Sequence, residues 1–496
     1  MHEKINNIGQ LKQSGWKSQS VKEELRRNLM VKVQKGEQLF PGILGYDKTV
    51  LPQIQHAILA KHDMILLGLR GQAKTRILRM LVHLLDEYMP IVEGSEINDD
   101  PFKPISRYAK ELVTKHGDDT PISWLHRDFR YGEKLATPDT TVSDLIGDID
   151  PIKAASLKLS LASEEVINYG LIPRTNRGIF VINELPDLQP RIQVALLNIM
   201  QERDIQIRGF NIRIPVDLFM AFSANPEDYT NRGNIITPLK DRIDAQIITH
   251  YPKEMDIAMQ ITEQEAWVNR DEKSNIHIPK IYREILENVA FEARESEYID
   301  QKSGVSTRMT ITAMEQALSS AERRSILNQD KDTTLRITDL YAMVPALTGK
   351  LELVYEGEQE GAVNVAKHII GKAIKRTFRT YFPDPQKRIQ DDEKSPYQTV
   401  IDWFAAGNRL EMYELQSDKD YIKKLDSVQG LSDLVKSETS HSLEKNDLYA
   451  MMDLVIEALH QYSKIGKDDL DDTTSYTDML GSMLGGMSEF DDEEYI

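Results

Sequence analysis

The sequence predicts an α/β fold with a parallel sheet, followed by a helical domain and a mainly helical C-terminal extension. Between residues 43 and 251, helical patterns alternate with short apolar runs bounded by turn residues or charges, namely Met64–Leu67, Gly178–Ile182 and Leu218–Ser223. Strands spaced by helices are typical of a parallel sheet covered by helices. Beyond Pro252 the strand signal fades and helical spacing dominates, at Lys280–Glu295, Met309–Asn328, Ile337–Tyr355, Thr399–Phe404 and Leu448–Tyr462.

Changes in composition divide the chain into five segments. Residues 1–40 predict an N-terminal helical segment that ends before a Pro-Gly pair, and residues 41–251 carry the α/β domain. Residues 252–382 predict a smaller helical domain, and residues 383–466 predict a helical extension. Residues 467–496 are rich in Asp and Glu around a Gly/Ser/Met-rich centre, which predicts a mostly disordered acidic tail.

The composition excludes several classes of function. The chain has 496 residues, of which 40% are hydrophobic and 28% are charged, as in ordinary soluble proteins. A formal net charge of −18 disfavours nucleic acid as a partner, because its phosphates must be neutralised by cations. The lack of cysteine excludes disulfides, thiolate zinc sites and thiol nucleophiles. Neither a signal peptide nor a run of about eighteen apolar residues occurs, which predicts a cytoplasmic protein without membrane insertion.

A glycine-rich loop follows the first predicted strand. The run Gly68-Leu-Arg-Gly71-Gln-Ala-Lys74-Thr75 lies between that strand and an apolar-periodic helix, the context that a phosphate-binding P-loop requires. In such a loop backbone N–H groups surround the phosphates, the lysine brings a cation to the β and γ oxygens, and the Thr hydroxyl can ligate Mg²⁺. The sequence therefore predicts ATP and Mg²⁺ as cofactors, bound by Gly68, Arg70, Gly71, Gln72, Ala73, Lys74, Thr75 and Arg76.

Ala73 stands where a P-loop usually has a glycine before its lysine. If this position requires a positive φ, the Cβ of Ala73 costs about 1 kcal/mol, which the loop can tolerate. The alternative interpretation is a chance glycine turn between a strand and a helix. Other motifs have to decide between these two interpretations.

The second predicted strand ends in Asn183-Glu184, at the edge of a parallel sheet where ligands bind. In a Walker B strand two acids stand here: the first holds Mg²⁺ through water, and the second polarises the attacking water. Asn183 replaces the first acid without its charge, so we expect weaker metal binding and slower hydrolysis. The alternative is a buried strand whose polar end enters a turn at Pro186-Asp187.

The third predicted strand ends in Ala224-Asn225-Pro226. An asparagine at a strand end can orient water beside a γ-phosphate, although an Asn-Pro turn alone accounts for the pattern equally simply. As the third polar strand end in the same order, Asn225 is interpreted as a sensor of the nucleotide.

Taken together, these motifs and the run Pro238–Asp244 resemble those of AAA+ ATPases of the MoxR and magnesium-chelatase ATPase-subunit clade. Alanine at the place of Ala73 is usual in the MoxR version of the loop. The segments Thr137–Gly147 and Gly170–Gly178 resemble this clade's insert before the Walker B strand. Ala195–Arg203 and the two runs after it, Ile205–Gly209 and Ile212–Pro215, resemble its helix and pre-sensor 1 hairpin. The resemblance covers residues 41 to about 350.

The resemblance implies an AAA+ P-loop NTPase core, with residues 252–382 as its helical lid domain. It implies that Lys74 and Thr75 bind phosphate and Mg²⁺, with Asn183 as a second metal contact. It also implies catalytic roles for Glu184 as the base, Asn225 as sensor 1, Arg242 as an arginine finger that reaches a neighbouring subunit, and Arg308 as sensor 2. Arg232 is a competing candidate for the finger.

The leading functional hypothesis is an ATP-hydrolysing ring motor, working as a hexamer, that remodels a partner protein or assists metal or cofactor insertion. The resemblance implies a partner with a von Willebrand A domain. A second hypothesis is an ATP-binding assembly scaffold in which Asn183 has made turnover negligible. A true magnesium-chelatase ATPase subunit is a third, against which stand the long C-terminal extension and Asn183. The acidic tail either keeps the protein soluble or docks on a basic partner.

Overall fold

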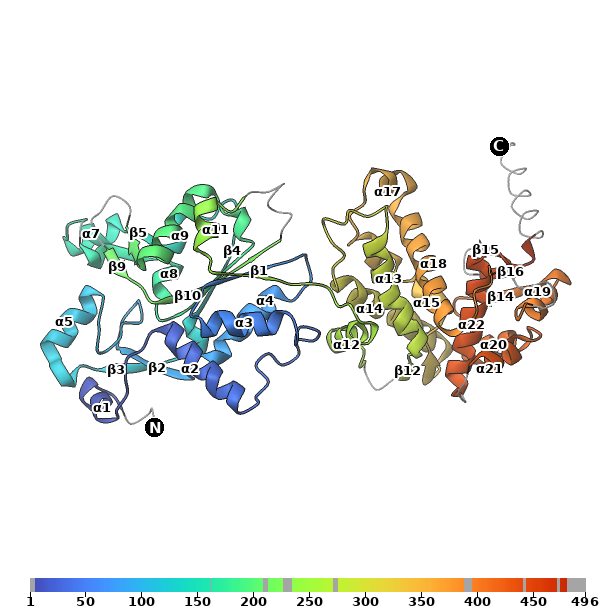
Figure 1. Ribbon diagram of the computed structural model, residues 1–496, viewed down its shortest axis with the longest axis horizontal. Helices are drawn as coiled ribbons and strands as arrows, with labels where there is room; N and C mark the ends of the chain where they lie inside the picture. The colour runs from blue at the N-terminus through green and yellow to red at the C-terminus, as the bar shows by residue number, and fades with distance from the viewer. Residues whose placement is uncertain are drawn as a thin grey trace. The chain divides into compact units, whose positions relative to one another are not determined.

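The computed structural model describes residues 5–161, 163–207, 213–225, 234–270, 275–387, 395–439, 443–470 and 473–479. The chain forms two compact units, residues 1–251 and residues 252–496 (Figure 1). Among the described residues, no helix has both the length and the apolar character needed to cross a membrane.

A five-stranded parallel sheet forms the centre of the first unit, in the order β11-β1-β10-β7-β4. The three strands predicted from apolar runs are confirmed as β1 (Met64–Leu67), β7 (Gly178–Asn183) and β10 (Leu218–Ala224). The two edge strands, β4 (Tyr131–Leu135) and β11 (Ala245–Ile248), were not predicted. Both contain polar residues, since an edge strand is buried less completely than a central one. The predicted α/β fold class is confirmed.

Helices cover both faces of this sheet. Alternate residues of a strand point to opposite faces, so Val181 of β7 joins one core and its neighbour Ile182 the other. One face carries α2 (Val21–Gln34), α3 (Val50–Leu59) and α4 (Lys74–Met80). The other face carries α9 (Pro190–Glu202) and α11 (Thr237–Arg242).

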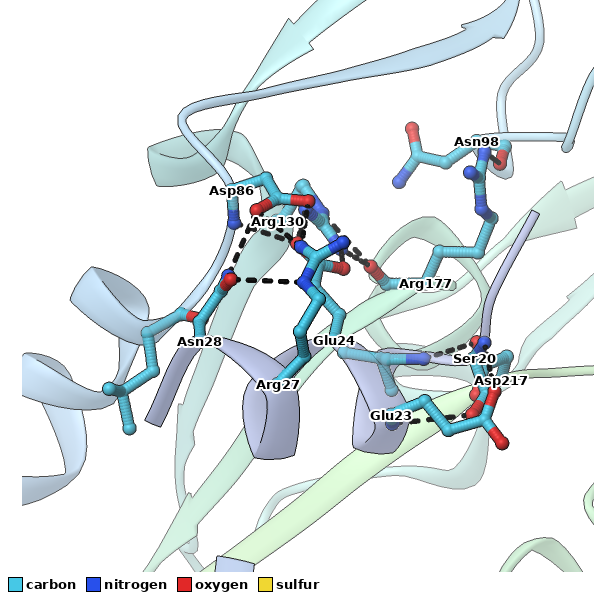
Figure 2. Close-up of polar contacts among 12 residues, drawn as sticks. Ser20, Glu23, Glu24, Arg27, Asn28, Asp86, Asn98, Arg130, Arg177 and Asp217 are labelled. Carbon is cyan, nitrogen blue, oxygen red and sulfur yellow. Dashed lines mark hydrogen bonds and ion pairs between the residues drawn. The ribbon is translucent and has the colours of Figure 1, made fainter. Parts of the chain in front are cut away.

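The N-terminal segment packs onto the sheet through a buried polar network as well as apolar contacts. Glu24 of α2 accepts two hydrogen bonds from the Arg130 guanidinium, at 2.7 and 2.6 Å, and Arg130 also donates to the carbonyl oxygen of Arg177 (Figure 2). Lys22 forms a second buried ion pair with Asp63, at 2.8 Å. The segment is therefore built into the first unit and does not form a separate body. A short helix, α1 (Ile8–Gln13), precedes α2.

Several small elements extend from the sheet's connections. The predicted hairpin after α9 is confirmed as β8 (Asp204–Gln206) and β9 (Arg213–Pro215), and its tip lies outside the described residues. The remaining elements are β2 (Tyr88–Val92), α5 (Arg107–His116), β3 (Ile122–His126), α6 (Val142–Leu145), β5 (Gly147–Ile149), α7 (Pro151–Leu157), β6 (Ile167–Tyr169) and α8 (Leu171–Arg174).

The second unit is mainly helical and has one continuous hydrophobic core from Ala266 to Tyr476. The lid domain and the extension, predicted as separate segments, share this core. Its helices are α12 (Met255–Glu265), α13 (Lys280–Glu295), α14 (Arg308–Asn328), α15 (Ile337–Tyr341), α16 (Val344–Thr348), α17 (Tyr355–Glu360), α18 (Ala362–Tyr381), α19 (Gln398–Ala405), α20 (Asp418–Asp426), α21 (Leu431–Glu438) and α22 (Lys445–Gln461).

The prediction of disorder from residue 467 is wrong for residues 467–470 and 473–477. In a three-stranded antiparallel sheet, β16 (Thr473–Thr477) pairs with β15 (Gly466–Leu470) on one side and with β14 (Leu410–Tyr413) on the other. Buried Tyr476 and the Lys467–Glu457 ion pair attach this hairpin to the helical core, which composition alone does not reveal. A second small sheet pairs β12 (Asn275–His277) with β13 (Asp332–Thr334). The acidic residues 480–496 lie outside the described residues.

Candidate functional site

Three polar chain segments meet at the carboxyl edge of the sheet. Register places Leu67 beside Ala224, and Ile182 beside Phe222, so the adjacent strands β1, β10 and β7 end at the same level. The loop 68–75, the pair Asn183-Glu184 and Asn225 follow these three ends. Sequence reasoning predicted each segment separately, and the parallel register brings them to one edge.

The loop has the backbone geometry that the sequence suggested. Gly71 has a φ of 73° and Ala73 a φ of 57°, so Ala73 does occupy the left-handed region that favours glycine. At Gly68 a Cβ would lie 1.9 Å from Oγ1 of Thr249 and 2.2 Å from Oε1 of Gln72, which only glycine avoids. These residues shape a tight turn between β1 and α4.

Residues outside the motif hold the loop, and sequence reasoning missed them. Thr249 donates to Oε1 of Gln72 at 2.6 Å, and Tyr46 donates to the carbonyl oxygen of Gln72 at 3.1 Å. Tyr251 donates to the carbonyl oxygen of Arg70 at 2.9 Å. Burial raises the pKa of Tyr46 from 10 to about 12, so its hydroxyl remains a donor even in alkaline solution. The loop is thus fixed by segments more than twenty residues away in sequence on either side.

Lys74 is buried within the loop, and its Nζ donates to the carbonyl oxygens of Gly68 and, at 2.9 Å, of Leu69. Its ammonium group therefore lies against the loop that is predicted to hold phosphates. Arg70 and Arg76 are exposed on either side of it.

A polar cluster joins Thr75 to the strand ends. Oγ1 of Thr75 lies 3.5 Å from Oδ1 of Asn183, and the buried Ser223 hydroxyl donates to the same Oδ1 at 2.9 Å. On its other side, Nδ2 of Asn183 donates to Oε1 of Glu133 at 2.7 Å. Glu133 in turn accepts two hydrogen bonds from Arg79, at 2.8 and 3.0 Å. Glu133 was missed because it lies on the polar edge strand β4.

Glu184 adopts a left-handed conformation, with φ 54° and ψ 51°, directly after β7. Such a backbone costs a non-glycine residue about 1 kcal/mol or more, and conformations of this kind cluster at functional sites. Its N–H donates to the Ser223 hydroxyl at 3.3 Å. The strained turn gives the predicted base a defined place beside the polar cluster.

Asn225 follows β10 and is buried, and within the described part of the chain its Oδ1 has no hydrogen-bond partner. A buried amide oxygen without a partner costs about 1–3 kcal/mol. This oxygen can accept a hydrogen bond from a water molecule or a ligand at this edge of the sheet.

The predicted arginines are placed as follows. Arg242 ends α11 and forms an ion pair with Asp241. Arg308 is exposed at the start of α14, in the second unit. Arg232 lies outside the described residues. Roles for these three side chains remain predictions.

The donor set fits a magnesium nucleotide. The Thr75 hydroxyl and the Asn183 amide supply the hard oxygen atoms that Mg²⁺ prefers. No cluster of three His, Cys, Asp or Glu side chains suited to a metal occurs in the described ranges. A site with few side-chain ligands suits a cation that arrives bound to phosphates, which Mg²⁺ usually does.

Two curated relatives are both named magnesium-chelatase 38 kDa subunit. The protein from Rhodobacter capsulatus is 26% identical over 235 residues, covering 47% of this chain and 61% of its own. The protein from Cereibacter sphaeroides is 24% identical over 208 residues, covering 41% and 56%. This chain therefore spans about three fifths of these relatives. No family model matches it. A solved structure of a complex between BchI and BchD of magnesium chelatase has 19% identity and a TM-score of 0.33, covering 65% of this chain and 98% of that one.

Proposed function

Since this chain belongs to the AAA+ clade of the MoxR proteins and the magnesium-chelatase ATPase subunit, we propose that it binds ATP with Mg²⁺ and hydrolyses it as a motor. One observation carries the proposal: the ends of three adjacent strands bring Lys74, Asn183-Glu184 and Asn225 to one edge. A chance glycine turn would not require the other two strand ends to be polar.

Each side chain has a distinct task in this proposal. The Lys74 ammonium neutralises the β and γ oxygens, and Mg²⁺, when bound through Thr75 and Asn183, neutralises further phosphate charge. The Glu184 carboxylate accepts a hydrogen bond from the attacking water and takes up its proton as that water adds to the γ-phosphorus. The bond between the γ-phosphorus and the β–γ bridging oxygen breaks in the same step, and ADP leaves. The Asn225 amide orients the same water. The buried Ser223 hydroxyl hydrogen-bonds to both Asn183 and Glu184, and so keeps them in fixed relative positions.

Binding and hydrolysis are tested separately in the full chain. We expect Lys74→Ala to abolish binding of a fluorescent ATP analogue, because the phosphate charge loses its buried counter-ion. Lys61→Ala is the matched control, since Lys61 is an exposed lysine of the same unit and pairs with Glu23. Glu184→Gln should preserve binding and lower steady-state phosphate release by about 10²-fold or more. Phosphate release that neither substitution alters would contradict the proposed ATPase.

A second candidate function is an ATP-binding assembly scaffold with little turnover. The observation that favours it is Asn183, which offers an amide where hydrolytic members of the clade have a carboxylate. Under this alternative, Lys74→Ala still abolishes ATP binding. The wild-type chain then releases phosphate no faster than the Glu184→Gln variant.

The assembly is proposed to be a ring, most simply a hexamer, in which Arg242 completes the site of the neighbouring subunit. Arg242→Ala should lower ATPase activity by about 10³-fold, and mixing it with Lys74→Ala chains should restore part of that activity. Restoration requires the finger to act between subunits, because each variant alone lacks one half of every site. Arg232→Ala, assayed in parallel, decides between the two finger candidates.

The proposed client is a protein with a von Willebrand A domain, remodelled directly or during metal or cofactor insertion. A Glu184→Gln chain that binds ATP without hydrolysing it should retain such a protein in a pull-down, and release it when ATP is removed. A true magnesium-chelatase role requires more: ATP-dependent insertion of Mg²⁺ into a porphyrin by this chain together with its partners.

A further inference from the structure

Asn183 differs from an aspartate in a way that matters for a cation. An aspartate presents an oxygen whichever way its carboxylate turns, whereas the two ends of an asparagine amide are an oxygen and an NH₂ group. Only the oxygen can face Mg²⁺ or accept a hydrogen bond from its water shell. A metal site built on Asn183 therefore requires a neighbour that fixes the rotation of the amide.

Among the described residues, three side chains contact this amide, and only one distinguishes its ends. The hydroxyls of Ser223 and Thr75, at 2.9 and 3.5 Å, can each donate or accept a hydrogen bond. The Glu133 carboxylate can only accept, and its Oε1 lies 2.7 Å from Nδ2 of Asn183. Glu133 thus draws the NH₂ group to its own side and turns the amide oxygen towards Thr75.

Glu133 is itself held in place. Arg79 lies on α4, the helix that follows the loop 68–75, and donates to both carboxylate oxygens, at 2.8 and 3.0 Å. Tyr131 donates to one of them at 3.2 Å. A two-point contact between guanidinium and carboxylate fixes the plane of the carboxylate as well as its position. A continuous series of hydrogen bonds, Arg79–Glu133–Asn183, therefore connects α4 to the predicted metal contact.

We infer that Glu133 is a positioning residue that orients the Asn183 amide oxygen towards the cation accompanying ATP, and so compensates for the missing Walker B aspartate. This inference rests on the proposed function. The inference also predicts what an aspartate would do at position 183. It would place a second carboxylate within hydrogen-bond distance of Glu133, where the two negative charges repel each other. The carboxylate on β4 and the amide on β7 are therefore complementary, and neither should be changed alone.

The test measures ATP affinity in the full chain with excess Mg²⁺ and with EDTA, using a fluorescent ATP analogue. The ratio of the two Kd values is the Mg²⁺-dependent gain in affinity. Glu133→Gln should lower this gain about tenfold, as loss of a partner that orients a metal ligand does. Its Kd in EDTA should stay at the wild-type value, because phosphate binding through Lys74 is intact. A collapsed site would lose affinity under both conditions.

The decisive measurement repeats Glu133→Gln in an Asn183→Asp background. There the substitution should raise the Mg²⁺-dependent gain, since it removes the repulsion between two carboxylates and leaves the aspartate free to turn either oxygen to the cation. The same substitution thus has opposite signs in the two backgrounds. A purely structural role for Glu133 predicts a loss in both.

Asp86→Asn is the matched control, because Asp86 also accepts two hydrogen bonds from an arginine, Arg27, and one from an asparagine, Asn28, away from the loop (Figure 2). The Mg²⁺-dependent gain in ATP affinity of Asp86→Asn should equal that of the wild type. The inference is overturned if Glu133→Gln leaves the Mg²⁺-dependent gain in ATP affinity unchanged. It is also overturned if Glu133→Gln changes this gain in the same direction in the wild-type and the Asn183→Asp chains. If Lys74→Ala also leaves ATP binding intact, the proposed function fails with it; if Lys74→Ala abolishes binding, the inference alone fails.

Discussion

Glu24 and Glu133 each hold an arginine through two hydrogen bonds, but they differ in their access to water. The Glu24–Arg130 pair is almost completely buried between α2 and the sheet, with side-chain exposures of 5% and 1% (Figure 2). In the Glu133–Arg79 pair, at the carboxyl edge of the same sheet, the exposures are 21% and 64%.

Because they differ in burial, these two glutamate–arginine pairs have different roles. A buried charge without its partner cannot be solvated, so the Glu24–Arg130 pair commits α2 to one position on the sheet. An exposed pair contributes little to stability, since water replaces either partner readily. Glu133 is therefore available to orient Asn183 without being needed by the fold. Glu287 of α13 is a third case, a buried carboxylate whose hydrogen bond, at 2.5 Å, comes from the hydroxyl of Thr262.

Glu24→Gln should have the largest effect on stability. The substitution leaves the Arg130 guanidinium charged and buried, which we expect to lower the free energy of unfolding by about 3–5 kcal/mol. Chemical denaturation of the full chain measures this change. Glu23→Gln is the control, because Glu23 directly precedes Glu24 on α2 and its ion pair with Lys61 is exposed. Glutamine also keeps the helix cap, so the expected loss is under about 1 kcal/mol. Equal losses in the two variants would contradict the assigned role of burial.

Glu287 should give the next effect, and it should depend on pH. Burial raises the pKa of Glu287 to about 7 in the folded state, whereas in the unfolded chain it has the ordinary value of 4.5. The folded state therefore binds more protons between these values, so its stabilising contribution is complete below pH 4.5 and is lost as the pH rises through 7. The loss amounts to roughly 3 kcal/mol.

Glu287→Gln carries no proton to release, so this part of the pH dependence should disappear from its denaturation curves between pH 4.5 and 8. The wild-type chain serves as the reference at each pH. An identical pH dependence in both chains would show that Glu287 is solvated or paired in the folded state.

Glu133→Gln should lower the free energy of unfolding by less than about 1 kcal/mol, because its ion pair lies at the surface. Combined with its expected effect on Mg²⁺-dependent ATP affinity, this result would separate function from stability at one residue. Denaturation of the nucleotide-free chain measures it. A loss as large as that of Glu24→Gln would mean that Glu133 is a structural residue.

Ala73→Gly is expected to have the smallest effect and the opposite sign. Glycine relieves the cost of a Cβ at a φ of 57°, about 1 kcal/mol, but adds freedom to the unfolded chain worth about 0.4–1 kcal/mol. We therefore expect denaturation to show a net stabilisation of about 0.5 kcal/mol or less. Ala195→Gly, within α9, should instead destabilise the chain by about 1 kcal/mol. Destabilisation at both positions would contradict the strain assigned to Ala73.

The comparison between regions also explains which parts of the site could be predicted. Lys74, Asn183 and Asn225 follow apolar runs, so the same local pattern that predicts a central strand also marks its polar end. Glu133 has no such signal, since β4 reads Tyr-Gly-Glu-Lys-Leu and resembles a loop. Thr249 and Tyr46 contact the loop through residues distant in sequence, and nothing local distinguishes them from other polar residues.

The sequence by itself determined the three central strands of the parallel sheet, the glycine-rich loop that follows the first of them, and the mainly helical character of the second half. These depend on local periodicity and local steric limits. Tertiary structure alone decided that α2 packs on the sheet, that β15 and β16 join a small sheet, and that Glu133 lies beside Asn183. Each of these depends on which strands become neighbours and on burial, and those are properties of the folded chain as a whole.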